Sequence, residues 1–78
     1  MWFVYLIKCS DGTVYAGCTS DLEERIKRHN AGSVPSTSDR LPIMLITYIA
    51  FTDKYKAFEF EKYLKGGSGR AFLSKRLV

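Results

Sequence analysis

The chain opens with two strand-like segments joined by a very short connection. Residues 2–9 and 13–18 are rich in aromatic and β-branched side chains, and Ser10-Asp11-Gly12 lies between them. Aromatic and β-branched residues favour strands, whereas an Asp-Gly step between two such segments favours a tight turn. The pattern therefore predicts an antiparallel hairpin.

The length of the loop decides which side chains share a face of this hairpin. A two-residue Asp-Gly turn fits the residues, and a three-residue loop that ends with Gly12 in the left-handed region fits them equally well. In the three-residue form Tyr5 pairs with Gly17, and Tyr5 and Tyr15 become diagonal neighbours on one face. The two-residue form separates the two tyrosines, because a shift of one residue turns side chains to the other face.

The three-residue form also predicts which face of the hairpin enters the core. The face opposite the tyrosines carries small and apolar side chains, namely Val4, Leu6, Val14, Ala16 and Cys18. Cys9 then falls on the other side of the hairpin from Cys18. Nothing in their spacing suggests a disulfide framework, and we expect free thiols in a cytoplasmic protein.

A helix, a loop and a third strand follow the hairpin. Ser20-Asp21-Leu22-Glu23 has the pattern of a capping box and predicts a helix that runs to about Asn30 and stops at Ala31-Gly32. Residues 33–42 contain two prolines with several Ser and Thr, and predict a loop. Ile43 to Phe51 is a nearly continuous apolar run, which predicts a strand buried on both faces.

The last third of the chain is predicted to be helical. Thr52-Asp53 indicates the start of a second long helix, which runs to about Lys65 and ends at Gly66-Gly67. Gly69 to Leu77 predicts a short terminal helix. Seventy-eight residues leave room for one hydrophobic core and no internal repeat is visible, so we expect a single domain over residues 1–78.

The charge balance is only mildly basic. Twelve Lys and Arg against eight Asp and Glu give a net charge of +4, which favours polyanions weakly. The apolar opening lacks the leading positive region and the cleavage site of a signal peptide. No apolar run approaches the roughly 18 residues of a membrane span. These features predict a cytoplasmic protein without a membrane segment.

The first predicted helix places polar side chains where apolar ones are expected. At about 100° per residue, Leu22, Ile26 and His29 share one narrow sector and Arg25 lies on its edge. Taken singly, His29 is more simply a core histidine bonded to a backbone carbonyl. Arg25 is likewise more simply an arginine with a buried stem and a solvated head. Their spacing makes the two residues neighbours on one helix face.

The second predicted helix carries a carboxylate on its apolar side. Ala57 and Leu64 mark this side together with Phe60, and Glu61 lies among them, whereas Glu59 falls on the solvent side. Burying a carboxylate is costly unless it has a partner or a metal. An ion pair with an arginine or a lysine explains the position of Glu61 as well as a metal site does.

As a set, these residues suit phosphodiester cleavage. Two tyrosines, an arginine, a histidine and a carboxylate are expected to converge between the hairpin and the two helices. A tyrosine oxygen can orient or deprotonate an attacking water, a cation can hold the phosphate, and a metal ion can neutralise the charge that develops. One carboxylate suffices for Mg²⁺, because this ion keeps several waters and takes substrate oxygens.

The order of these motifs resembles the GIY-YIG superfamily over nearly the whole chain. It is most similar to small single-domain members that resemble the N-terminal nuclease half of an excinuclease. Phe3-Val4-Tyr5 and Tyr15-Ala16-Gly17 stand for the two family triplets. Residues 21–30 are similar to the family helix that carries an arginine and a histidine, and residues 56–65 to its metal-binding helix. Two departures are the absence of a glycine in the first triplet and of an asparagine after Glu61.

The resemblance implies an α/β (α+β) fold, with a three-stranded antiparallel sheet flanked by helices. It gives Tyr5 the role of general base or water-orienting group, with Tyr15 beside it. Arg25 would hold the scissile phosphate, and His29 would assist proton transfer. Gly17 would have a structural place in the second triplet.

The function implied is that of a Mg²⁺-dependent endonuclease that hydrolyses phosphodiester bonds in DNA, in a structure-selective or repair-related role. Glu61 would hold the single Mg²⁺ or Mn²⁺ ion. Surface cations would contact DNA phosphates, namely Lys27, Arg28, Arg40 and Arg70. Because no separate DNA-binding domain is visible, a targeting protein partner is expected. The alternative is a non-catalytic module that keeps the fold and binds DNA or a partner.

Overall fold

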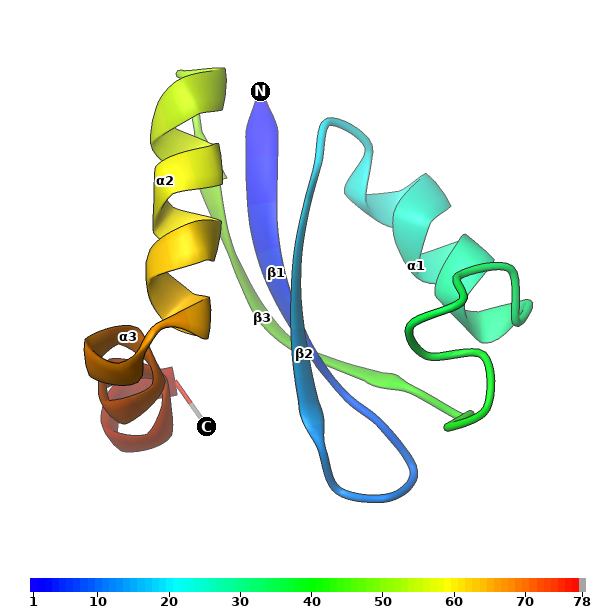
Figure 1. Ribbon diagram of the computed structural model, residues 1–78. Coiled ribbons are helices and arrows are strands. Elements are labelled where there is room, and N and C mark those ends of the chain that lie inside the picture. The colour runs from blue at the N-terminus through cyan, green and yellow to red at the C-terminus, as the bar shows by residue number, and fades with distance from the viewer. Residues whose placement is uncertain (78) are drawn as a thin grey trace.

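In the computed structural model, which describes residues 1–77, the opening segments form the hairpin with the three-residue loop (Figure 1). β1 (Trp2–Lys8) and β2 (Val14–Thr19) pair so that Tyr5 lies opposite Gly17. The Cys9 amide donates to the Thr13 carbonyl over 2.8 Å, and Gly12 has a φ of +87°. The predicted register of the three-residue form is confirmed.

The third strand pairs with the other side of β1. β3 (Met44–Phe51) runs antiparallel to β1, and the sheet order is β2-β1-β3. The prediction that this strand is buried on both faces is wrong, since Met44 and Tyr48 are 66% and 50% exposed. An apolar run is buried on both faces only where other elements cover both, and β3 lies at the edge of the sheet.

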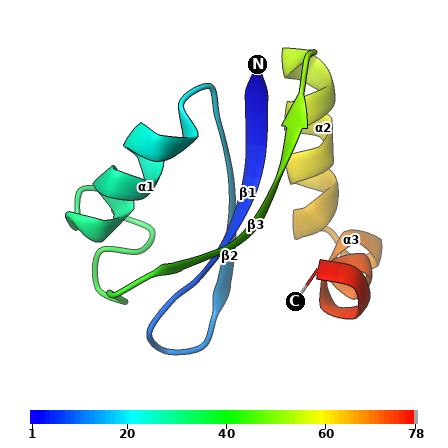
Figure 2. The ribbon, with the colours of Figure 1, turned by 180° about the vertical axis from the view of Figure 1, so that it is seen from behind.

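Two long helices cover opposite faces of the sheet, as the front and back views show (Figures 1 and 2). α1 (Leu22–Asn30) lies on one face and α2 (Lys54–Lys65) on the other. α3 (Gly67–Phe72) follows α2 and continues into a π-helical turn, η1 (Leu73–Leu77). The α+β fold class is confirmed. No helix within residues 1–77 is long and apolar enough to cross a bilayer.

The caps of the two long helices follow from aspartates. The Asp53 carboxylate accepts from the Tyr55 amide over 2.8 Å and begins α2 as predicted. The predicted capping box at Ser20 is wrong, because Asp21 is the N-cap residue and accepts from the Glu24 amide over 3.1 Å. α1 therefore begins one residue later than the capping-box pattern implies.

The sheet separates two hydrophobic clusters. Beneath α2 lie the core-face residues of the hairpin and the apolar side of that helix, namely Val4, Leu6, Ala16, Ala57 and Leu64. On the α1 side lie Tyr5, Ile7, Cys9 and Ile43, with Leu22 and Ile26 against them. Cys9 and Cys18 are free thiols that pack against opposite clusters, as the register predicts. Tyr5 is therefore held in the smaller cluster, under α1.

Candidate active site

A chain of buried polar side chains runs from the sheet into the loop after α1. The Tyr5 hydroxyl lies 2.9 Å from His29 Nε2, and His29 Nδ1 lies 2.7 Å from Thr37 Oγ1. All three side chains are fully buried. Each polar group therefore depends on its neighbour in the chain for hydrogen bonding, because solvent does not reach them.

The proton positions follow from the chemistry of the three groups. A neutral imidazole has one donor and one acceptor nitrogen. If the Tyr5 hydroxyl donates to Nε2, then Nδ1–H donates to Thr37 Oγ1, and both contacts are satisfied. Burial, with the nearby charge of Arg25, lowers the pKa of His29 below its ordinary value of 6.5. His29 is therefore neutral at neutral pH and can accept a proton at Nε2.

Tyr15 and Arg25 complete this cluster on its open side. The Tyr15 ring centroid lies 6.5 Å from that of Tyr5 and 5.4 Å from that of His29. Arg25 is half-buried on α1, and its charge acts on both Tyr5 and His29. The structure thus brings four of the predicted residues together from three elements.

The Tyr5 hydroxyl holds its proton tightly. Burial raises the pKa of Tyr5 to about 12, with a smaller increase from Tyr15 and a partial reduction from Arg25. At neutral pH the free phenolate form is therefore negligible. A proton can leave this oxygen readily only if His29 takes it as another arrives.

Gly17 makes room for the Tyr5 ring on the neighbouring strand. It lies opposite Tyr5 in the hairpin register. A Cβ atom at this position would collide with the Tyr5 hydroxyl and the ring carbon that carries it. The glycine therefore sets where the Tyr5 oxygen lies, in agreement with the structural place expected for it.

We expect Gly17→Ala to push the Tyr5 ring away from His29. Overpacking a filled site costs about 1–3 kcal/mol, so the free energy of unfolding should fall by that amount. The pKa of His29, followed by NMR titration, should move toward its ordinary value as the site opens to water. Gly67→Ala is the control, because a Cβ there meets no atom within 4 Å. Equal destabilisation by both substitutions would contradict this account.

Glu61 reaches the cluster from the other face of the sheet. Its side chain is 22% exposed, and Oε2 lies 3.0 Å from Lys65 Nζ. The charge of Glu61 raises the pKa of Tyr5 and also that of the Cys18 thiol, for which burial is the larger cause. Its field therefore extends around the β2 edge to the Tyr5 side. Glu59 is exposed, as predicted.

The donor set around Glu61 fits a hard cation with few protein ligands. Within residues 1–77 no three His, Cys, Asp or Glu side chains gather in a metal-binding group. Zinc sites need three or four such ligands. Mg²⁺ is commonly held by one or two carboxylates, several waters and substrate oxygens. Lys65 provides the lysine pairing considered for Glu61, and a cation would have to displace or share that contact.

The four predicted DNA-contacting cations lie in different settings. Lys27 pairs with Glu23 at 3.6 Å on the exposed side of α1, and Arg28 is exposed beside it. The Arg40 head bonds Thr13 Oγ1 over 2.9 Å and also the Ser36 carbonyl. Its guanidinium is thus used inside the protein, where it ties the 33–42 loop to the hairpin.

Arg70 stands apart from these three. It lies on α3 and lines a cavity that Tyr15 also borders. None of the four cations touches the buried chain of hydrogen bonds directly, so their predicted role in DNA binding concerns the surface around the cluster.

Thr37 is the functional candidate that sequence reasoning missed. Its backbone is held by two turn hydrogen bonds, from its own amide to the Val34 carbonyl and from the Arg40 amide to its carbonyl. These turns bring its hydroxyl to His29. The loop also contains Ser33, Ser36 and Ser38, and no spacing rule distinguishes Thr37 from them.

We expect Thr37→Val to remove the partner of Nδ1–H without changing the shape of the side chain. An unsatisfied buried donor costs about 1–3 kcal/mol, which should appear as lower stability. The ¹⁵N shifts of the His29 ring should show that the neutral Nδ1–H tautomer is no longer the single form. Thr37→Ser keeps the hydroxyl and should retain that tautomer. If Thr37→Val leaves the ring shifts unchanged, the bond does not set the tautomer.

Comparison with known proteins places the chain in a family. The sequence matches the family model of the GIY-YIG catalytic domain over residues 1–75. The UPF0213 protein YsiG of Lactococcus lactis is 40% identical over 65 residues, which cover 82% of this chain and 62% of YsiG. The UPF0213 protein YazA of Bacillus subtilis is 42% identical over 64 residues, which cover 81% of this chain and 65% of YazA.

A solved structure shares the fold. The solution NMR structure of the UPF0213 protein BH0048 from Bacillus halodurans matches with a TM-score of 0.60 at 33% identity. The match covers 96% of this chain and 84% of that chain. The chain spans less than two thirds of the length of YsiG and YazA.

Proposed function

The chain belongs to the GIY-YIG family, and from that premise we propose that it is a Mg²⁺-dependent endonuclease that hydrolyses phosphodiester bonds in DNA. The observation that carries the proposal is the hydrogen bond between the Tyr5 hydroxyl and His29 Nε2. It couples a tyrosine oxygen to a neutral base inside a dry site. A bond of this kind has an evident use in proton transfer from an attacking water.

The proposed step moves one proton along this chain. A water oxygen attacks the phosphorus and gives a proton to the Tyr5 oxygen, while the Tyr5 proton passes to His29 Nε2. The bond from phosphorus to the leaving oxygen breaks, and that oxygen takes a proton from solvent. His29 becomes an imidazolium, whose Nδ1–H still donates to Thr37 Oγ1, and it later returns its extra proton to water.

Arg25 and Glu61 act on charge rather than on protons. Arg25, beside Tyr5, would bind a non-bridging oxygen of the scissile phosphate. Glu61 would hold one Mg²⁺ or Mn²⁺ ion, which when bound supplies positive charge against the negative charge that develops on the phosphate. The free thiols support a cytoplasmic location. A structure-selective or repair-related role, with a targeting partner, remains part of the proposal.

Two observations favour the alternative of a non-catalytic DNA- or partner-binding module. The Tyr5 side chain has no exposed surface, so an attacking water needs an opening beside it. Lys65 contacts the Glu61 oxygen that a cation would take. Both features suit a protein that keeps the fold and its basic surface but binds without cutting.

A nicking assay separates the two functions. Supercoiled and branched DNA are incubated with the protein in Mg²⁺, in Mn²⁺ and in EDTA, beside a filter-binding titration on the same substrates. The proposed enzyme nicks DNA only when a divalent ion is present. Binding without nicking in either metal supports the alternative, and neither binding nor nicking removes DNA as the substrate.

A further inference from the structure

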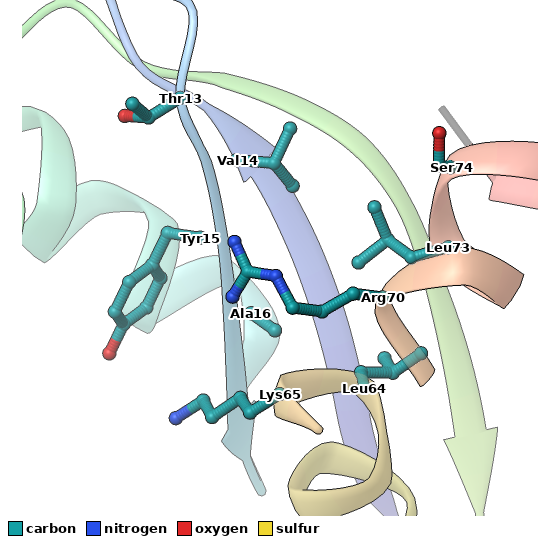
Figure 3. Close-up of a pocket in the computed structure, with 9 residues that line it drawn as sticks. All are labelled: Thr13, Val14, Tyr15, Ala16, Leu64, Lys65, Arg70, Leu73 and Ser74. Atoms are coloured by element: carbon teal, nitrogen blue, oxygen red, sulfur yellow. The ribbon is translucent and has the colours of Figure 1, made fainter. Parts of the chain in front are cut away.

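A second polar cavity adjoins the candidate active site and shares Tyr15 with it. Its volume is about 650 Å³, and it lies between β2, the end of α2, and the α3–η1 segment. Its border includes Val14, Tyr15, Lys65, Arg70 and Leu73 (Figure 3). Ligand sites in proteins are typically about 300–1,000 Å³, so the cavity is large enough for one nucleotide.

The cavity presents cations and no acid. Lys65 and Arg70 are its charged lining residues, and no Asp or Glu borders it. Figure 3 shows the Arg70 side chain extending across the cavity toward β2, with Lys65 below it. Lys65 pairs with Glu61, but within residues 1–77 no carboxylate forms an ion pair with Arg70. The cavity therefore offers one uncompensated guanidinium to an anionic ligand.

Arg70 is carried by a packed helix rather than by a free tail. The Phe72 ring lies 6.4 Å from the Phe60 centroid and 6.2 Å from that of Tyr63, both on α2. Leu73 and Leu77 pack against the main core cluster. These contacts fix α3 and η1 on the body of the protein, so the position from which Arg70 extends is defined.

Tyr15 and Lys65 connect the cavity to the active-site cluster. One side of the Tyr15 ring faces His29 at 5.4 Å, and Lys65 Nζ lies 5.8 Å from its centroid. A strand of DNA whose scissile phosphate lies at Arg25 would therefore pass Tyr15 on its way along β2. The cavity is the first recess on that path that carries unpaired positive charge.

We propose that this cavity is a subsite for the nucleotide next to the scissile phosphate, whose own phosphate is bound by Arg70 and Lys65. The inference rests on the proposed function only in taking DNA as the ligand. Arg70 binds the phosphate with a planar guanidinium, which matches two phosphate oxygens at once. Val14, Leu64 and Leu73 form the apolar part of the cavity and pack against the sugar.

The test uses binding alone, in the absence of metal, so that cleavage plays no part. A 5′-phosphorylated thymidine dinucleotide is titrated into the ¹⁵N-labelled protein, beside the same dinucleotide without its 5′-phosphate. We expect saturable shifts of the amides of residues 13–16, 65 and 73–74, and much weaker binding of the unphosphorylated form. Shifts confined to α1, or equal binding of the two dinucleotides, would overturn the subsite.

Matched arginine variants locate the charge. Arg70→Met keeps most of the side-chain length and should weaken binding of the phosphorylated dinucleotide roughly tenfold, since hydrogen bonds to charged groups are among the stronger ones. For a longer DNA strand, the slope of log affinity against log salt should fall by about one. Arg76→Met removes the same charge from η1, outside the cavity lining, and should leave both values unchanged. Equal losses in the two variants would overturn the proposal.

The result is separable from that of the nicking assay. A protein that nicks DNA but shows no phosphate-dependent shifts at β2 and η1 keeps its proposed function and loses this subsite. A protein that binds the dinucleotide there but never nicks DNA keeps the subsite and is not a nuclease.

Discussion

Replacing Glu61 by glutamine is expected to lower metal-dependent nicking by roughly a thousandfold, the upper range seen when a group that stabilises transition-state charge is removed. Glutamine keeps the shape of the side chain but removes the charge that would hold the cation. Stability should change little, because the pair with Lys65 lies near the surface, where such pairs contribute about 0–1 kcal/mol. The measurements are nicking rates across a Mg²⁺ titration and a thermal unfolding curve.

Glu59→Gln is the matched control for that experiment. It makes the same chemical change on the same helix, on an exposed side chain that faces away from the core. Nicking should be unchanged. If the two glutamine variants behave alike, the effect comes from the charge of α2 as a whole, and Glu61 is not the metal ligand.

The residues that sequence predicted well are those whose place depends on local geometry. Two loop lengths were open for the hairpin, and only the three-residue loop puts Tyr5 and Tyr15 on one face, as the structure has them. Helical spacing alone put His29 on the inner side of α1 and Glu59 on the outer side of α2. In each case the period of the element decides the side chain's direction, whatever the rest of the chain does.

The start of α1 was missed by one residue for a local reason. Ser20 and Asp21 are both good N-cap residues. The Thr19 hydroxyl accepts from the Asp21 amide over 3.1 Å and donates to the Asp21 carbonyl over 3.2 Å. These bonds hold the backbone of Asp21 outside the helix, so its carboxylate, and not the Ser20 hydroxyl, caps the first turn.

Tertiary contacts were beyond sequence reasoning. The exposure of β3 depends on whether another strand or helix covers it, which an apolar run does not reveal. Thr37 reaches His29 only because the 33–42 loop folds back under α1, and that path is set by turns and by the contact of Arg40 with Thr13. Lys65 was one of several lysines that could pair with Glu61, and only the packed helix selects it.

Tyr5→Phe is expected to reduce nicking by about 10²–10⁴-fold, the usual range for loss of a general acid–base group. Phenylalanine keeps the ring in the α1-side cluster but leaves His29 Nε2 without its donor, so stability should fall by about 1–3 kcal/mol. Tyr48→Phe is the control, because Tyr48 lies opposite Tyr5 on β3 and is half-exposed. It should change neither rate nor stability appreciably.

The pH profile of the parent distinguishes the proton relay from a free phenolate. His29 must be neutral to accept the Tyr5 proton, so nicking should rise with pH through the pKa of His29, which lies below 6.5, and stay level through neutral pH. Stability should follow the same direction. Because burial lowers the pKa in the folded state, the unfolded chain binds more protons, and the free energy of unfolding falls as pH drops below about 6.5. A rate that instead climbs steadily up to pH 10 would show that Tyr5 acts as a phenolate base without His29, since its own pKa of about 12 would then control the rate.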